Sequence, residues 1–220
     1  MNAMDTERAR FNMIEQQIRP WEVLDDRVLT VIARTPREVF VPDAYRGLAF
    51  ADISIPLGHG QAMMPPKLEA RLLQSLELEG GEEILEIGTG SGYLAACLAR
   101  LGGHVHSVDL YEDFIEAARA RLEAQGIDNV TLEVRDAAHG WDDGRRFDAI
   151  AVTGSLPVLH RGFHDALKPG GRLFVIVGTP PVMQARLITR GGETEWCETG
   201  LFETSVPPLV GAPRPDRFRF

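Results

Sequence analysis

The sequence predicts an α/β fold of the doubly wound type, in which a mostly parallel sheet carries helices on both faces. From residue 67 onward, short and continuously apolar runs alternate with helical runs, the pattern expected when helices cover both faces of a parallel sheet. A glycine-rich turn follows the first apolar run and leads directly into a helix. Acidic residues then follow the next two strands at their ends. These three features together are typical of a nucleotide-type ligand site.

The composition narrows the class of protein. An apolar fraction of 44% and a charged fraction of 25% in 220 residues are average for one globular unit. The net charge of −9 disfavours nucleic acid as a partner, because phosphate binding needs clustered cations. No apolar stretch approaches the ~18 residues of a membrane span. Cys97 and Cys197 lack metal-ligand spacing, so we expect reduced cysteines, no metal site and a cytoplasmic protein without membrane attachment.

The N-terminal part is predicted to be helical and then irregular. Residues 5–18 form one amphipathic run and Asp25 begins a second, which predicts two helices. Five prolines then divide the segment up to residue 66, and this indicates a wrapping lid of short irregular elements. We therefore divide the chain into an N-terminal helical extension with an acceptor-side loop, residues 1–66, and a core, residues 67–220. The two parts are expected to form one compact unit.

The core is predicted to repeat a strand and a helix. Expected helices cover residues 67–76, 93–100, 111–125 and about 163–167, and expected strands cover residues 84–87, 105–108, 131–134, 149–152 and 172–177. After a proline break, residues 186–189 and 204–206 are predicted to be closing strands. Residues 211–219 read as a tail rich in proline and arginine.

The turn after the first core strand indicates the kind of cofactor. Its glycines follow the spacing Gly88-x-Gly90-x-Gly92, without the extra residue of the dinucleotide fingerprint, and Glu86 precedes them. A dinucleotide offers a pyrophosphate to such a turn, whereas S-adenosyl-L-methionine offers an ammonium, a carboxylate and a sulfonium. An acid beside the turn suits the cationic ligand. The sequence therefore favours S-adenosylmethionine over a nicotinamide cofactor, and an oxidoreductase is the weaker alternative.

Two further acids complete the predicted cofactor site. Asp109 ends the second core strand, the position from which a carboxylate accepts hydrogen bonds from both ribose hydroxyls. Asp136 follows the third strand; it is interpreted either as a turn residue or as an acceptor for the adenine amino group, with the backbone N–H of Ala137 donating to the ring. The predicted cofactor-binding residues are Glu86, Gly88, Thr89, Gly90, Gly92, Asp109, Leu110, Asp136 and Ala137.

The chain resembles the protein-L-isoaspartate O-methyltransferase family over nearly its whole length. The resemblance is carried, in the family's order, by the segments PREVFVP (36–42), IPLGHGQ (55–61), LEIGTGSGY (85–93), FDAI (147–150) and VPPL (206–209). It implies a Rossmann-like, seven-stranded class I methyltransferase. It also implies methyl transfer from S-adenosylmethionine to the carboxylate of isoaspartyl residues in damaged proteins. The resulting ester cyclises and can reopen as aspartate, which makes the reaction a repair step.

The acceptor loop departs from the family's pattern. Relatives carry a Thr-x-Ser after the glycine-glutamine pair, whereas this chain has Ala62-Met-Met-Pro-Pro66, so Ala62 and Met64 occupy the hydroxyl positions. The catalytic residues are left unknown, with His59, Gln61 and Met64 as acceptor-loop candidates. Besides an isoaspartyl protein or peptide, another and less charged small acceptor stays open, as does a protein that binds S-adenosylmethionine without turnover. Ser155, after the fourth core strand, is interpreted as a turn residue, with a role on the acceptor side as the alternative.

Overall fold

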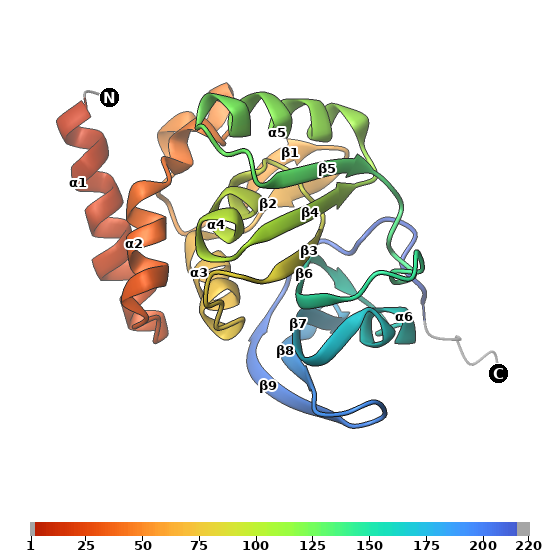
Figure 1. Cartoon of the computed structure of the whole chain (residues 1–220). Helices are drawn as coiled ribbons and strands as arrows, with labels where there is room; N and C mark the ends of the chain where they lie inside the picture. The colour runs from red at the N-terminus through yellow and green to blue at the C-terminus, as the bar shows by residue number, and fades with distance from the viewer. Residues whose placement is uncertain (1–2, 215–220) are drawn as a thin grey trace.

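The computed structural model describes residues 3–214 (Figure 1). Its helices are α1 (Ala3–Met13), α2 (Asp26–Arg34), α3 (Pro66–Ser75), α4 (Tyr93–Leu101), α5 (Glu112–Ala124) and α6 (Arg161–Asp165). A π-helical turn, Ile14–Ile18, continues α1, and short 3-10 turns follow at Arg19–Trp21, Arg37–Val39 and Asp43–Leu48. No helix in this described part is long and apolar enough to cross a membrane.

Within residues 3–214, nine strands form two sheets. A hairpin pairs β1 (Ile55–Gly58) with β2 (Gln61–Met63). The main sheet contains β3 (Glu83–Ile87), β4 (His104–Asp109), β5 (Val130–Val134), β6 (Phe147–Leu156), β7 (Leu167–Thr179), β8 (Val182–Arg190) and β9 (Trp196–Thr204). Its order is β5-β4-β3-β6-β7-β8-β9; β5 to β7 are parallel, and β8 and β9 each run antiparallel to their predecessor. The predicted seven-stranded, mostly parallel sheet is confirmed.

The two faces of this sheet are covered differently. Ile84 and Val105 pack with α3, α4 and the N-terminal helices into one buried cluster. Leu85, Ile87 and Val108 point to the other face, where α6 and the loop 135–146 cover them. The alternation along β3 is the two-residue period of a strand with both faces buried. The first cluster extends from Met13 into the sheet, so residues on both sides of residue 66 pack in one core. The division of the chain at residue 66 stays a prediction.

The predicted helices agree with the structure at most of their ends. Asp25 caps α2 as its sequence position suggested, since its carboxylate accepts from the backbone N–H groups of Arg27 at 2.8 Å and Val28 at 3.4 Å. The helix expected around residues 163–167 begins and ends earlier, at Arg161–Asp165, because Leu167 already pairs with Phe147 as the first residue of β7.

The predicted closing strand at residues 204–206 is wrong. The last strand is β9, which ends at Thr204, and the chain then turns toward the carboxyl ends of the parallel strands. The pairing with β8 ends at Thr204, and Pro208 instead forms an isolated bridge with Ser155 of β6. β9 itself lies at the sheet edge and is largely solvent-exposed. Its acidic residues interrupt the apolar pattern from which a strand is predicted.

Candidate active site

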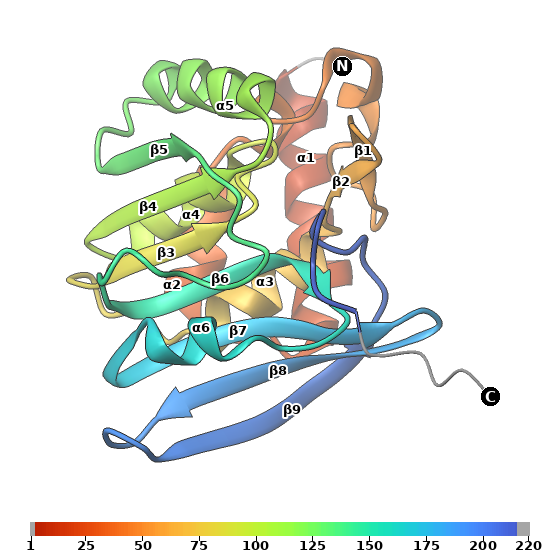
Figure 2. The same ribbon diagram turned by 90° about the vertical axis from the view of Figure 1, so that its right-hand side faces the viewer.

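The largest concentration of predicted site residues lies where the parallel strands end. In Figure 2 the arrowheads of β3, β4 and β6 point to the side where the β1–β2 hairpin and the chain after β9 also lie. The strand order reverses between β3 and β6, and open α/β sheets bind their ligands at such a point. A cavity here, the main cavity, is lined by residues that include Gly88, Gly90, Asp109, Asp136 and Ala137. A smaller inner cavity adjoins it and is lined by Glu86 and Thr89.

The glycine turn brings backbone rather than side chains up to the main cavity. Gly88 has φ +99° and Gly90 φ +49°, in the left-handed region that glycine tolerates best. A Cβ at Gly88 would lie 2.2 Å from the hydroxyl of Thr153, which donates to the carbonyls of Ile87 and Gly88. Gly92 is not among the residues lining either cavity. It packs against α5 instead, because a Cβ there would lie 2.9 Å from Ala118.

Glu86 is fully buried and only half satisfied. Ser107 donates to Oε2 of Glu86, and the Thr89 hydroxyl lies 2.6 Å from that of Ser107. Since the Ser107 proton goes to Glu86, Thr89 is the donor of the second bond. Oε1 of Glu86 is buried with no hydrogen-bond partner in the described residues, which is costly unless a ligand supplies a donor. Burial raises the pKa of Glu86 to about 8, the Ser107 bond opposing the shift.

Asp109 is held in place by the glycine turn. Its carboxylate accepts from the backbone N–H of Gly90 at 2.8 Å and from that of Tyr111 at 3.1 Å. These bonds leave further lone pairs for a ligand, and the residue lines the main cavity while only 9% exposed. Burial raises the pKa of Asp109, and the backbone N–H groups oppose that rise. Leu110, the next residue, also lines the cavity.

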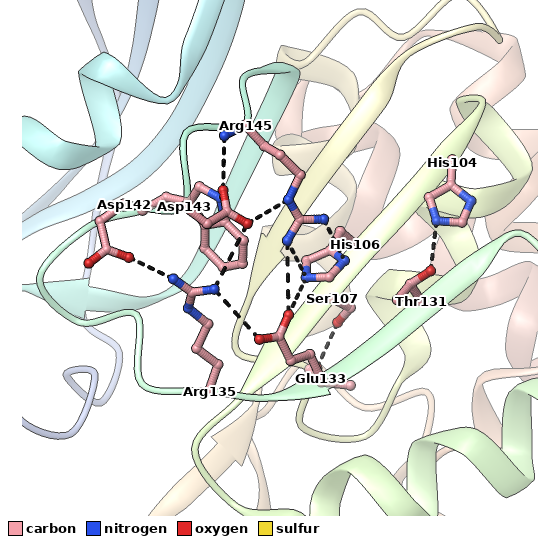
Figure 3. Close-up of polar contacts among 11 residues, drawn as sticks. His104, His106, Ser107, Thr131, Glu133, Arg135, Asp142, Asp143 and Arg145 are labelled. Atoms are coloured by element: carbon pink, nitrogen blue, oxygen red, sulfur yellow. Dashed lines mark hydrogen bonds and ion pairs between the residues drawn. The ribbon is translucent and has the colours of Figure 1, made fainter.

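The loop 135–146 carries Asp136 and Ala137 and is fixed by a polar cluster beside β4 and β5 (Figure 3). Arg135 bonds to Asp142 at 2.6 Å, and its guanidinium lies 4.1 Å above the ring of Trp141. Within the loop, Asp136 accepts from the backbone N–H of Ala138 at 3.0 Å, which is the turn role that the sequence suggested. That bond uses Oδ1 only. The second carboxylate oxygen remains for a ligand in the main cavity.

The other end of the main cavity is built from two distant segments. The hairpin contributes Leu57, Gln61 and Ala62, and Met64 follows directly after it. The chain after β9 contributes Val206, Pro207, Leu209 and Val210. Buried Ser155 anchors the second segment: its hydroxyl donates to the carbonyl of Val206 at 3.0 Å and its N–H to that of Pro207 at 2.9 Å. The sequence analysis did not predict that this segment lines the cavity. Its position in the chain is that of the Val-Pro-Pro-Leu motif, which served only for the family resemblance.

The three acceptor-loop candidates do not stay together. Gln61 and Met64 line the main cavity, whereas His59 is not among its lining residues. The ring of His59 stacks on Tyr111 with 3.9 Å between centroids, and its Nε2 lies 3.0 Å from the carboxylate of Asp113. His59 therefore fastens the hairpin tip to the start of α5, and the nearby imidazole lowers the pKa of Asp113.

A buried ion pair supports the backbone at Met64. Arg37 donates to Glu69, to the carbonyl of Met64 at 2.7 Å and to the carbonyl of Ala49 at 2.8 Å, and it lies over the ring of Tyr93. Every arm of this guanidinium is thus satisfied, which a buried cation requires. Burial raises the pKa of Glu69 to about 7, and Arg37 opposes the rise.

The molecule has a doubly wound sheet, an acid in β3 just before the glycine turn, and a buried carboxylate that ends β4. This is the arrangement expected of the class of S-adenosylmethionine-dependent methyltransferases. Comparison with known proteins agrees. A family model described as protein-L-isoaspartate(D-aspartate) O-methyltransferase matches residues 8–210. The chain therefore belongs to the protein-L-isoaspartate(D-aspartate) O-methyltransferase family.

Individual relatives extend over most of the chain. A protein-L-isoaspartate O-methyltransferase from Brucella anthropi is 38% identical over 206 residues, 93% of this chain and 94% of that one. A Syntrophotalea carbinolica enzyme of the same name is 36% identical, with 94% and 96% covered. A Plasmodium falciparum protein assigned to the same activity, solved with S-adenosyl-L-homocysteine, has the same fold, with a TM-score of 0.77, 19% identity and 93% and 97% covered.

Proposed function

We propose that this methyltransferase acts on the side-chain carboxylate of isoaspartyl residues in polypeptides, and that the ends of β3 and β4 hold its cofactor. The observation that carries the cofactor part is the buried, unpartnered oxygen of Glu86 beside the glycine turn. It fits the ammonium of S-adenosylmethionine, as Asp109 fits the ribose hydroxyls. When bound, that cofactor supplies an electrophilic methyl group on a sulfonium. Asp136 and Ala137 would hold the adenine.

The chemistry asks little of the acceptor side. An acceptor carboxyl with a reference pKa near ~4 is already ionised at pH 7, so no side chain has to remove a proton. The chain's task is to align an oxygen with the methyl group and to keep water out. The apolar wall formed by Met64, Val206 and Leu209 excludes water. Gln61 is the polar group of the hairpin on this cavity, and its amide can donate to the acceptor.

One observation favours a second candidate function. The hydroxyl positions of the family are Ala62 and Met64 here, and both line the main cavity. An anion placed beside them finds fewer hydrogen bonds than it needs, and such a loss is costly when the site is closed to water. A less charged acceptor on the same scaffold would not suffer that cost.

A transfer assay separates the two functions. The chain is incubated with methyl-labelled S-adenosylmethionine and an isoaspartyl peptide, with the same peptide carrying normal aspartate as the control. Base-labile label in the isoaspartyl peptide alone is the expected result. Label absent from both peptides, but present in another component of a cell extract, would overturn the isoaspartyl assignment and support the second acceptor.

The cellular compartment of the reaction is also a proposal. Both cysteines are free, Cys97 buried and Cys197 exposed, and free thiols are typical of a reducing compartment. We keep the cytoplasm as the proposed location.

A further inference from the structure

A second hollow, which we call the side groove, adjoins the acceptor end of the main cavity. It has a volume of about 800 Å³ and lies between the tip of the β1–β2 hairpin, the end of β6, the β7–β8 turn and the chain after β9. Gln61, Pro207, Leu209 and Val210 line both the groove and the main cavity. A molecule whose reacting group lies in the main cavity can therefore continue into the groove without leaving the protein surface.

The walls of the side groove suit an extended polypeptide. Four prolines line it, at 157, 180, 207 and 208, and proline presents a rigid apolar surface without an N–H. Beside these, Val210 lines the groove while 43% exposed, and Leu209 and Met183 add further apolar side chains to its wall. Apolar side chains gathered at a hollow in this way mark a surface for a macromolecule. A small free acid would leave them uncovered.

One cation gives this groove a charge. Among the described residues that line it, Arg214 alone is charged. Arg214 is exposed, and no ion pair or hydrogen bond joins it to another described residue. A guanidinium is the side chain best suited to pair with a carboxylate. The groove is thus complementary to a segment that carries an acidic residue.

We propose that the side groove holds the acceptor polypeptide on one side of the methylated residue, and that Arg214 pairs there with an acidic side chain of that polypeptide. The proposal rests on the proposed function, because it takes the acceptor to be a residue within a polypeptide. Arg214 is a specificity-determining residue in this account and has no part in the chemistry. Pairs between exposed charges change affinity by about two- to fivefold.

The test uses isoaspartyl peptides that differ only in a flanking residue. Glu, Gln or Lys is placed at the same distance before or after the isoaspartyl residue, and KM and kcat are measured for each peptide. On one side, the Glu peptide is expected to have a KM about two- to fivefold below that of the Gln peptide, with kcat unchanged. The KM of the Lys peptide should lie above that of the Gln peptide. Added salt should shrink these differences, because salt screens exposed charges.

Variants show whether Arg214 is responsible. Arg214→Gln should remove the preference, Arg214→Lys should keep it and Arg214→Glu should reverse it. Arg161→Gln is the matched control, since Arg161 is also exposed, lies on α6 and does not line the groove. If the Gln peptide is not methylated at all, the proposed function fails. If it is methylated but Arg214→Gln keeps the parent's preference, the groove proposal alone fails.

A deletion distinguishes the polypeptide from another occupant. Removing residues 215–220 should leave the charge preference in place if the acceptor polypeptide occupies the groove. Faster turnover of every peptide after the deletion, regardless of its charge, would identify the chain's own last residues as the occupant and overturn the proposal.

Discussion

The two halves of the active site are built in different ways. The cofactor half lies within residues 86–137 and consists of backbone groups and acids, of which Glu86 and Asp109 are held by hydrogen bonds among β3, the glycine turn and β4. The acceptor half joins a hairpin at residues 55–63 to a segment after residue 205, and its lining is largely apolar. A local motif can specify the first half by itself. The second half depends on the whole fold, so it can change its lining without disturbing cofactor binding.

The largest expected effect tests the cofactor half. Asp109→Ala should weaken binding of S-adenosylmethionine by roughly 10- to 150-fold, the ~1.5–3 kcal/mol of hydrogen bonds to a charged group. Calorimetry measures the change, and thermal unfolding checks that the variant is folded. Parent-like binding by a folded Asp109→Ala chain would mean that another group holds the ribose.

The second expected effect concerns the charge state of Glu86. Its pKa of about 8 means that the ligand-free protein binds a proton there at pH 7, whereas an ammonium ligand favours the carboxylate. Affinity for S-adenosylmethionine should therefore rise by up to ~10-fold per pH unit from about pH 6, and level off near pH 8, where the ligand's amino group also titrates. Calorimetry in buffers of different ionisation enthalpy should detect proton release on binding.

The sign for stability is the opposite. Because burial raises the pKa of Glu86 above its ordinary value of 4.5, the ligand-free fold loses stability as the pH rises toward and through about 8. Glu69 contributes in the same direction, since its pKa is also raised. Glu86→Gln separates the two residues, because only the Glu86 part of the pH dependence should disappear. If the stability of Glu86→Gln depended on pH as that of the parent does, the raised pKa of Glu86 would be refuted.

The third effect tests the acceptor half. The double change Ala62→Thr, Met64→Ser places hydroxyls on the main cavity, and isoaspartyl kcat/KM should rise by ~10-fold or more, the worth of one recovered hydrogen bond to an anion. Met13→Ser is the matched control, because Met13 is similarly buried and lines neither the main cavity nor the inner cavity. A double variant that gains nothing would favour the less charged acceptor.

The smallest effect is expected at His59. His59→Asn keeps a residue that tolerates the left-handed backbone at φ +52° and removes the ring stacked on Tyr111. Stability should fall by about 0.5–1 kcal/mol in a denaturant titration, and methyl transfer should change less than twofold. A much larger loss of kcat would return His59 to the acceptor site.

The sequence predicted the cofactor half better than the acceptor half for a physical reason. Gly88, Gly90 and Asp109 act where a strand ends, and a strand end can be read from a short apolar run. The wall at Val206–Val210 is placed by Ser155, about 50 residues earlier in the chain, and no local pattern encodes that contact. The exposed acidic residues of β9 also interrupt its apolar pattern, so the sequence places the last strand at residues 204–206, where the true strand already ends. The left-handed backbone of His59, with φ +52°, is likewise not indicated by its residue type.

The segment that follows β9 has a consequence for biosynthesis. During synthesis the glycine turn, Asp109 and Asp136 leave the ribosome before the segment from Val206 to Val210. That later segment forms one wall of the main cavity. A chain stalled after β9 therefore carries the predicted cofactor residues without this wall, and we expect methyl transfer only after the segment has reached Ser155.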